Sequence, residues 1–375
     1  MYKRYYLDKI PSLLEPNKVL VLYGPRRAGK TTLLNAFLKD FSGKYFLGFG
    51  DDGNLRDVLK TQEIDKIKQF FGGYELIVID EAQRIPEIGL VLKLMVDHIP
   101  GIKVIATGSS SFDLSNRIGE PLTGRQRVFK LFPISVLEIS AQFQSYEANK
   151  MLGDLLIYGS YPETLLKKSY AEKREYLELL RDSYLYKDIL ELENLRNADK
   201  LSDLLRLLAF QVGNEVSLNE LSNALDLSKQ TIERYLDLLE KAFVILRVRG
   251  FSRNLRKEVS KTAKYYFLDN GIRNAVINNF NLLEARNDAG QLWENFLFIE
   301  RLKKRAYLDI YANIYFWRTY DQKEIDLVEE RDGKLFGFEF KWGDKKKKPP
   351  RIWLETYKNA SYEVVNKENF LGFVA

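Results

Sequence analysis

The sequence predicts an α/β protein whose N-terminal part is a parallel sheet with helices on both faces, and three observations lead to this prediction. Short apolar runs at 19–22, 76–79 and 103–107 have the composition of strands that are buried on both faces. Stretches with helical spacing separate these runs, and strands that alternate with helices build parallel sheets. A glycine-rich loop directly follows the first run and opens a helical stretch. We expect this α/β region to extend over residues 18–135.

The glycine-rich loop has the spacing G-x-x-x-x-G-K-[ST], is followed by a second threonine, and reads Gly24-Pro25-Arg26-Arg27-Ala28-Gly29-Lys30-Thr31-Thr32. Its glycines let the backbone curl so that several N–H groups point at one phosphate, and the next helix adds its positive dipole end. Lys30 would reach the β- and γ-phosphates, and the Thr31 hydroxyl would coordinate Mg²⁺. The loop therefore predicts that residues 24–32 bind a nucleoside triphosphate with Mg²⁺.

Polar residues follow the other two apolar runs. Asp80 ends the run at 76–79, where it would hold Mg²⁺, and the adjacent Glu81 would orient the attacking water. Ser109 follows the run at 103–107 and would hydrogen-bond the γ-phosphate or that water; the alternative is a serine-rich turn that caps the next helix. Arg125 is a candidate arginine finger, acting in its own subunit or on a neighbour, and a structural or surface arginine is the alternative.

Composition excludes several kinds of chemistry. The 375 residues contain no cysteine, which rules out disulfides, thiolate catalysis and cysteine-ligated zinc. Because His98 is the only histidine, histidine triads and histidine metal clusters are also excluded. No apolar run approaches the length of a membrane span, and no signal core follows the N-terminus. We therefore expect a soluble, cytoplasmic protein of two or three domains that makes no membrane contact.

Two capped helices are predicted beyond residue 215. Ser217-Leu218-Asn219-Glu220 is a capping-box sequence that opens one helix, and Ser228 precedes a second helix over 229–242. A short turn separates the helices and strands follow them, which predicts a winged helix-turn-helix. Glu233 and Asp237 on the second helix would repel phosphates, so this helix is a poor reader of the major groove.

Basic residues concentrate in the segment 241–275. It carries nine basic and two acidic residues, a local net charge of +7 against +6 for the whole chain. Such a segment is typical of a surface that contacts the phosphate backbone of DNA. The alternative is that the winged domain serves only as a lid or a platform for a protein partner.

Carboxylates recur near the C-terminus. In Phe338-Glu339-Phe340-Lys341-Trp342 the alternation puts Glu339 and Lys341 on one strand face, and a turn at 331–334 would bring Asp326 close to Glu339. Glu294 lies on the preceding helix among apolar neighbours. Together these residues resemble the PD-(D/E)XK nuclease-like fold. The resemblance implies Mg²⁺ ligands at Glu294, Asp326 and Glu339, with Lys341 polarising a water; the alternative is a hairpin whose polar face meets solvent.

The chain as a whole resembles AAA-type ATPases of archaea and bacteria that carry a C-terminal conserved domain of unknown function. The resemblance is carried by residues 24–32, Asp80-Glu81-Ala82-Gln83, Thr107-Gly108-Ser109-Ser110, Leu122-Thr123-Gly124-Arg125 and Tyr158-Gly159-Ser160-Tyr161-Pro162-Glu163. The family commonly has a second glycine where Ser160 stands. The resemblance implies an ATP-dependent switch or motor of the signal-transducing branch. The absence of an Asn-Lys-x-Asp guanine signature agrees with adenine.

Four regions follow from these observations. We expect a P-loop ATPase core over 1–145, a helical lid or linker over 146–212, a winged helix-turn-helix over 213–280 and a nuclease-like α/β domain over 281–375. ATP and Mg²⁺ are the expected cofactors. One hypothesis is an ATPase whose nucleotide state controls DNA-binding domains and a candidate DNA-cleaving domain. This ATPase could act as an oligomer. The other is an ATP-driven regulatory switch that recognises a protein partner and has an inactive nuclease-like domain.

Overall fold

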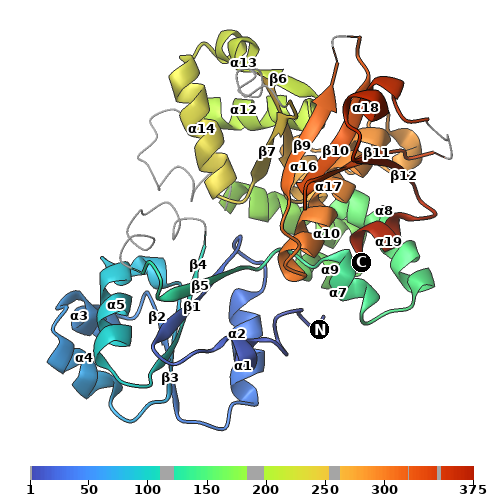
Figure 1. Ribbon diagram of the computed structural model, residues 1–375. Helices are drawn as coiled ribbons and strands as arrows, with labels where there is room; N and C mark the ends of the chain where they lie inside the picture. Colours follow the sequence, from blue (N-terminus) through green and yellow to red (C-terminus); the bar gives the residue numbers. More distant parts are fainter. Residues whose placement is uncertain (1, 110–121, 184–197, 253–261, 320, 344–347) are drawn as a thin grey trace. The chain divides into compact units, whose positions relative to one another are not determined.

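The computed structural model describes residues 2–109, 122–183, 198–252, 262–319, 321–343 and 348–375 (Figure 1). Apart from the first two residues, its contacts divide the chain into two compact units. The first unit contains residues 3–133 and 241–243, and the second contains residues 134–240 and 244–375. Each unit has its own sheet and is described separately.

The first unit is built on a five-stranded parallel sheet, sheet A, in the order β2-β3-β4-β1-β5. Its strands are β1 (Lys18–Tyr23), β2 (Tyr45–Phe49), β3 (Leu76–Asp80), β4 (Lys103–Gly108) and β5 (Gln126–Lys130). The three predicted apolar runs form β1, β3 and β4, and the predicted parallel α/β sheet is confirmed. The sequence did not indicate β2 and β5, because these edge strands expose part of their side chains and lack a continuous apolar run.

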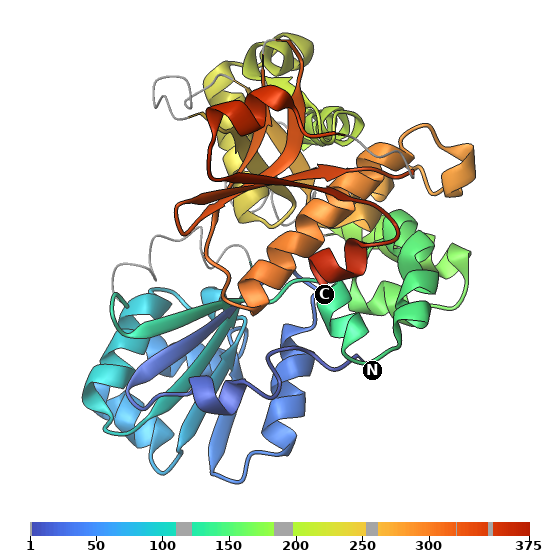
Figure 2. The ribbon, with the colours of Figure 1, turned by 45° about the vertical axis from the view of Figure 1, so that its right-hand side comes forward.

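Helices cover both faces of sheet A (Figures 1 and 2). The helices are α1 (Ile10–Leu13), α2 (Lys30–Lys39), α3 (Gly53–Lys60), α4 (Ile64–Phe71) and α5 (Ile88–His98), and a short 3₁₀ helix, η1 (Ala82–Arg84), follows β3. Helices α3, α4 and α5 lie on one face, where their apolar side chains pack against Val19, Ile77 and Val104. Helix α2 lies on the other face. Burial on both faces explains why the central strands are uniformly apolar.

The second unit begins with helices, and most of them lie in the region 146–212 that the sequence predicts to be helical. They are α7 (Val136–Ser140), α8 (Ser145–Tyr158), α9 (Pro162–Leu166), α10 (Tyr170–Leu180) and α12 (Ala198–Phe210). Further along the chain lie α13 (Leu218–Leu225), α14 (Lys229–Lys241), α16 (Asn270–Val276), η3 (Leu283–Ala285), α17 (Ala289–Tyr307), α18 (Arg351–Thr356) and α19 (Phe370–Val374). Among the residues that the structure describes, no helix combines the length and apolar character needed to cross a membrane.

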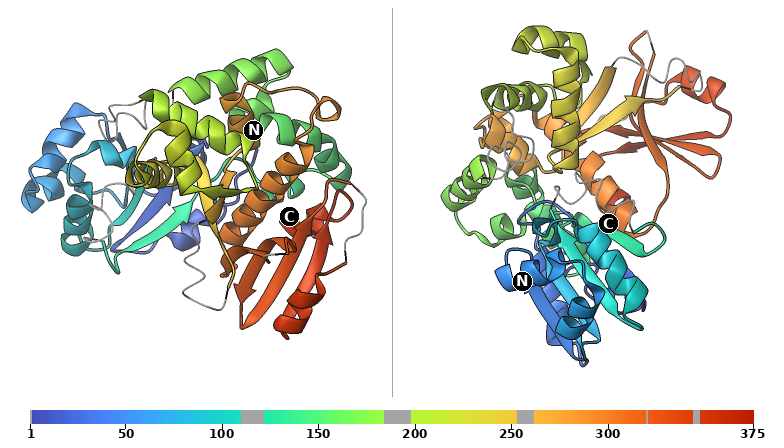
Figure 3. Two further views of the ribbon diagram at one scale, coloured as in Figure 1. Left: turned by 90° about the horizontal axis from the view of Figure 1, so that it is seen from above. Right: turned by 90° about the vertical axis from the view of Figure 1, so that its left-hand side faces the viewer.

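A mixed seven-stranded sheet, sheet B, runs through the second unit in the order β12-β11-β10-β9-β7-β8-β6 (Figure 3). Its strands are β6 (Glu215–Ser217), β7 (Ile245–Gly250), β8 (Thr262–Phe267), β9 (Asn313–Arg318), β10 (Glu324–Arg331), β11 (Lys334–Phe340) and β12 (Ala360–Val365). Strand β7 pairs in parallel with β9, so one sheet contains strands from both sides of the predicted boundary at 280. The four-region division remains a prediction.

The helix pair α13–α14 agrees only in part with its predicted caps. The Ser228 hydroxyl accepts a hydrogen bond from the Thr231 N–H at 3.1 Å, which caps α14 as predicted. At the start of α13 the Ser217 side chain accepts no capping hydrogen bond, so the predicted capping box there is wrong. Ser217 is instead the last residue of β6, and its strand pairing with Thr262 of β8 fixes the backbone at this position.

The predicted hairpin between Asp326 and Glu339 is confirmed. Strands β10 and β11 pair antiparallel, with Arg331 opposite Lys334. The two residues between them, Asp332 and Gly333, have φ angles of 50° and 70°. Positive φ at both central positions is the geometry that favours Asp-Gly in two-residue hairpins.

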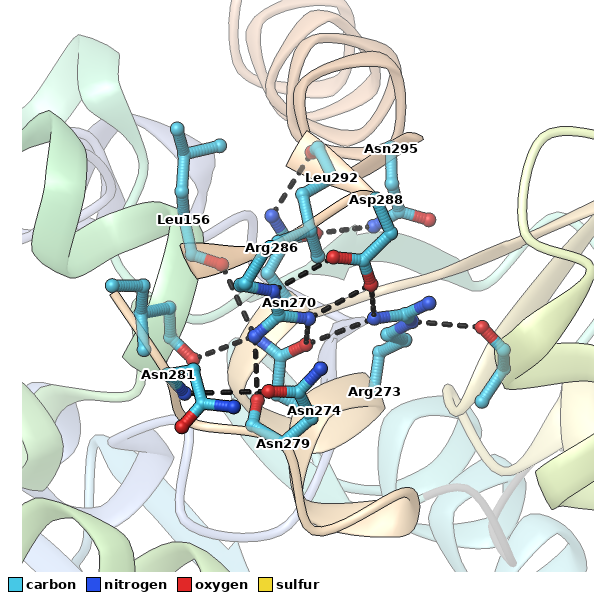
Figure 4. A network of polar contacts seen from close by, with 12 residues as sticks. Leu156, Asn270, Arg273, Asn274, Asn279, Asn281, Arg286, Asp288, Leu292 and Asn295 are labelled. Carbon is cyan, nitrogen blue, oxygen red and sulfur yellow. Dashed lines mark hydrogen bonds and ion pairs between the residues drawn. The ribbon is translucent and has the colours of Figure 1, made fainter. Parts of the chain in front are cut away.

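A buried polar network joins α16 to the start of α17 (Figure 4). Arg273 and Arg286 both donate to the Asp288 carboxylate, at 2.5 and 2.7 Å. Burial would raise the pKa of Asp288, but the hydrogen bonds from Arg286 and Arg273 lower this pKa to about 2. Arg273 also donates to the carbonyl of Ala209 at 2.8 Å, and Asn274 donates to the carbonyl of Ile157 at 2.8 Å. The network therefore ties α8, α12, α16 and α17 together.

Candidate functional site

The glycine-rich loop lies between β1 and α2, as its motif requires. Gly29 is the residue before the first turn of α2 and has a φ of 95°, a conformation that favours glycine. A Cβ atom on Gly24 would lie 2.1 Å from the carbonyl oxygen of Leu131, so only glycine fits at the start of the loop. Arg27 also has positive φ, 62°. The loop backbone is therefore held in the curled form that a phosphate needs.

Lys30 is buried at the first position of α2. Its Nζ donates to the carbonyl oxygens of Gly24 and Pro25 at 2.9 and 3.1 Å. Burial lowers the pKa of Lys30 to about 8, although Glu81 and Asp80 raise it in part. The ammonium group thus lies inside the loop, against backbone oxygens that a bound phosphate would replace.

Asp80 lies at the carboxyl end of β3, next to the loop. The Thr31 hydroxyl donates to Asp80 Oδ2 at 2.5 Å, and the Thr107 hydroxyl donates to Oδ1. Asp80 is 1% exposed and Thr107 is fully buried, so the Thr107 hydroxyl fixes the orientation of the Asp80 carboxylate. The neighbouring hydroxyl and carboxylate oxygens of Thr31 and Asp80 are ligands that suit Mg²⁺.

Glu81 follows Asp80 in a left-handed conformation, with φ at 52°. Its N–H donates to Asp80 Oδ1 at 3.1 Å, and its carboxylate accepts a hydrogen bond from Gln83 Nε2. Gln83 Nε2 also donates to the Ser109 hydroxyl at 3.1 Å. The structure thus brings Asp80, Glu81 and Ser109 together at the carboxyl edge of sheet A. Gln83, which the sequence analysis did not single out for a role, joins the last two.

Arg125 lies at the opposite edge of the sheet. Its carbonyl accepts a hydrogen bond from the N–H of Val19, near the start of β1, whereas Gly24 follows the end of that strand. The guanidinium forms an ion pair with Asp97 at 2.6 Å. Arg125 is therefore not near the nucleotide loop of its own chain, because β5 runs parallel to β1 and Arg125 precedes β5. An arginine finger in the same subunit is ruled out by this geometry, and a role toward a neighbour remains a prediction.

Three family descriptions match successive parts of the chain. Residues 16–140 match the family described as "AAA domain". Residues 149–283 and 289–369 match two domains of unknown function, DUF8612 and DUF4143. The match to the AAA domain covers β1, the glycine-rich loop, Asp80 and Glu81, and it supports an AAA-type P-loop ATPase.

Relatives of uncharacterized function align with most of the chain. The uncharacterized protein Rv2008c of Mycobacterium tuberculosis is 30% identical over 326 residues, which are 86% of this chain and 70% of the relative. The chain belongs to the family of Rv2008c. A more distant relative, the uncharacterized protein MJ1544 of Methanocaldococcus jannaschii, is 27% identical over 316 residues, 79% of this chain and 69% of that protein.

A solved structure supports the fold of this family. The Walker-type ATPase PABY2304 of Pyrococcus abyssi aligns with a TM-score of 0.50 and 19% sequence identity. The alignment covers 74% of this chain and 96% of that protein. At this identity the likeness concerns the fold, and it agrees with a P-loop ATPase arrangement of sheet A.

The C-terminal carboxylates are buried in the second unit. Asp326 and Glu339 are 7% and 1% exposed, so the alternative of a hairpin with a solvated polar face is wrong. Asp326 Oδ2 accepts the Phe340 N–H at 2.7 Å, and Lys341 forms an ion pair with Glu339 at 2.6 Å. Burial, together with the nearby charges of Glu294 and Glu339, raises the pKa of Asp326 well above its usual range.

Lys264 of β8 lies at the same cluster, which the sequence did not indicate. Its ammonium forms ion pairs with Glu324 and, at 3.4 Å, with Glu294. Burial alone would lower the pKa of Lys264, but the charges of Glu294 and Glu324 raise it above its usual value. Only the folded sheet brings residues 264, 294 and 324 together.

The described residues of the basic segment 241–275 do not form one basic surface. Lys264 and Arg273 are 1% and 2% exposed, and Arg247 pairs with Glu240 at 3.5 Å. Arg249 on β7 is exposed. Four of the nine basic residues (Arg253, Arg256, Lys257 and Lys261) lie outside the described residues. A count of charges overstated the phosphate-binding surface here, because buried ion pairs consume part of the charge.

Arg4 is a second buried cation that the sequence did not indicate. Its guanidinium is 5% exposed and donates to the carbonyl of Ala28, inside the glycine-rich loop, and to that of Phe132 at 2.6 Å. The partners lie 24 and 128 residues away in the sequence, so no local pattern could identify them. Arg4 therefore fastens the loop to the segment that follows β5.

We expect Arg4→Met to weaken ATP binding about tenfold, because charge-assisted hydrogen bonds to two backbone carbonyls are lost and the loop is held less firmly. Titration with a fluorescent ATP analogue measures the dissociation constant. Lys3→Met is the matched control, since Lys3 lies beside Arg4 but forms an exposed ion pair with Asp8. Equal affinities for both variants and the wild type would show that Arg4 only stabilises the fold.

Proposed function

We propose that this protein is a Mg²⁺-dependent ATPase whose nucleotide state controls an appended unit that contacts DNA. The observation that carries the ATPase proposal is the assembly of Thr31, Asp80 and Glu81 beside the loop that contains Lys30. The backbone of residues 24–32 and Lys30 would hold the triphosphate. Glu81 would orient and deprotonate the attacking water, with Gln83, which also donates to Ser109, fixing its carboxylate.

The residues of this site fit a magnesium ion. Thr31 and Asp80 already lie at hydrogen-bonding distance, so both oxygens can reach one ion with little movement. Bound Mg²⁺ would neutralise the charge that develops on the β- and γ-phosphates. Thr107 would keep the Asp80 carboxylate turned toward Thr31. Adenine is the proposed base, since the sequence has no guanine signature.

For the second unit we propose a winged helix-turn-helix. The support is the pair α13–α14, joined by a three-residue turn over 226–228, with β6, β7 and β8 beside it. Arg249 on β7 is exposed, and the segment after β7 carries four more basic residues in the sequence. This wing is the proposed contact with the DNA backbone.

For the C-terminal strands we propose a PD-(D/E)XK-like arrangement. Its support is the corner formed by Asp326, Glu339 and Lys341, with α17 behind the sheet. The Lys264 ammonium pairs with Glu294, the third predicted metal ligand, and with Glu324, which does not fit a metal-filled centre, so we assign no cleavage step to this arrangement.

A second candidate is an ATP-driven switch that recognises a protein partner. Its support is the burial of Lys264 and Arg273, which removes two cations from the proposed DNA-contacting segment. The two candidates share the nucleotide site and differ in what the second unit contacts.

Steady-state ATP turnover with and without duplex DNA tests the proposal, with Lys30→Ala as the blank. We expect DNA to stimulate turnover several-fold, and the stimulation to fade as salt is added, because phosphate contacts release counterions. Turnover that ignores DNA, together with a partner captured only in the presence of ATP, would favour the second candidate. No turnover above the blank under either condition would contradict the ATPase proposal itself.

A further inference from the structure

Lys264 is a buried cation of the second unit whose charge partners lie on two other elements, 30 and 60 residues further along the chain. It lies on β8, is 1% exposed, and forms ion pairs with Glu294 of α17 and Glu324 of β10. An ammonium group in such a place is stable only when carboxylates compensate its charge. The charge of Lys264 is therefore an integral part of the carboxylate cluster and not a surface charge.

Glu294, one of the three predicted metal ligands, already accepts two donors on one oxygen. Its Oε1 accepts the Tyr266 hydroxyl at 2.8 Å and lies 3.4 Å from Lys264 Nζ. On another side its carboxylate packs against Gly213, where an added Cβ would lie 3.1 Å from the carboxylate atoms. An incoming ion would have to displace the hydroxyl and the ammonium to reach Oε1 of Glu294.

Each of the other two predicted ligands has one carboxylate oxygen engaged. Asp326 Oδ2 accepts the Phe340 N–H at 2.7 Å, and Glu339 Oε1 accepts Lys341 Nζ at 2.6 Å. Across the described ranges, no group of three or more His, Cys, Asp or Glu side chains has the arrangement to hold a metal ion. Mg²⁺ requires close, near-octahedral oxygen ligands, which this arrangement does not provide.

We propose that the Lys264 ammonium takes the position of the divalent cation among the C-terminal carboxylates, so that this cluster is a structural charge centre and not a nuclease centre. The inference rests on the proposed PD-(D/E)XK-like arrangement of the same residues. An ammonium group satisfies the charge of Glu294 and Glu324, but it cannot lower the pKa of a bound water as a metal does. The C-terminal part of sheet B is therefore proposed to have no metal-dependent cleavage centre.

Replacing Lys264 by methionine removes the charge and keeps the length of the side chain. We expect Lys264→Met to unfold several degrees below the wild type in EDTA, because it leaves two partly buried carboxylates uncompensated. Millimolar Mn²⁺ should restore much of this loss, since the vacated position then admits a divalent cation. Melting temperatures are measured without nucleotide, so that the ATP site contributes no bound ion.

Two further measurements complete the test. In Lys303→Met, the matched control, an equally buried lysine is lost from its ion pair with Glu300, and Mn²⁺ should not restore the melting temperature. In the wild type, Mn²⁺ should not change the melting temperature, and electron paramagnetic resonance should detect no Mn²⁺ bound to the nucleotide-free protein. Asp326→Asn should give the same two results.

The proposal fails if the wild type binds Mn²⁺ and Asp326→Asn abolishes that binding, because a metal would then coexist with Lys264. It also fails if Lys264→Met folds and ignores Mn²⁺. Should Lys264→Met not fold, the comparison of the wild type with Asp326→Asn decides the matter alone. None of these results depends on DNA or on ATP turnover. Failure of this proposal can therefore be distinguished from failure of the proposed DNA-directed function.

Discussion

Lys30→Ala is expected to lose measurable ATP binding, with an affinity at least about 100-fold below that of the wild type. Charge-assisted hydrogen bonds contribute about 1.5–3 kcal/mol each, and Lys30 would form them with two phosphates. The ammonium already lies inside the loop, 2.9 Å from the carbonyl of Gly24, so it reaches a phosphate without moving far. Calorimetric titration with ATP and Mg²⁺ measures the change.

Lys39→Ala is the matched control for this variant, because Lys39 is the last residue of the same helix and is exposed. It should bind ATP as the wild type does. An unchanged dissociation constant in Lys30→Ala, with the melting temperature also unchanged, would remove Lys30 from phosphate binding and the loop from its assigned role.

The pH dependence of ATP affinity provides a second test of the same residue. Burial lowers the pKa of Lys30 to about 8, and bound phosphates would raise it, because they favour the charged ammonium. Affinity is then complete well below this pH and falls above it, by roughly fivefold between pH 8 and 9. Lys39→Ala, which keeps Lys30 and should bind ATP, should show the same decline. A flat profile in the wild type would show that Lys30 stays charged without a phosphate.

The nucleotide site could be predicted because its determinants are local in sequence. A phosphate loop needs glycines at fixed offsets between a strand and a helix, and a buried parallel strand that ends in Asp80 is visible as an apolar run followed by a carboxylate. Parallel strands bring their carboxyl ends to one edge, so Thr31 and Asp80 could be expected to meet, 49 residues apart. Motif and topology together determine this site.

The remaining features depend on contacts that no local pattern encodes. The partners of Arg4 are backbone carbonyls, which every residue carries, so the sequence gives no sign of them. From the sequence, Lys264 is one of nine basic residues in the segment 241–275. Its burial depends on the pairing of β7 with β9, which joins the winged region to the C-terminal strands. The edge strands β2 and β5 lack the continuous apolar run that burial on both faces imposes.

Glu81→Gln is expected to bind ATP with nearly the affinity of the wild type and to hydrolyse it about 10²- to 10⁴-fold more slowly, the range for loss of a general base. Glutamine keeps the size of the side chain but cannot accept a proton from water. The backbone of Glu81 is fixed by its N–H bond to Asp80 at 3.1 Å, so the exchange should leave Asp80 and the metal site in place. Binding and single-turnover hydrolysis are measured separately.

Glu87→Gln is the matched control. Glu87 has the same left-handed conformation, with φ at 50° against 52° for Glu81, but it follows the short helix η1 and not the strand. A backbone effect of the substitution would appear in both variants, whereas a chemical effect would appear only in Glu81→Gln. If Glu81→Gln turned over ATP at the rate of the wild type, another group would have to activate the water. Ser109 and Gln83, which contact each other beside it, would then be the next residues to replace.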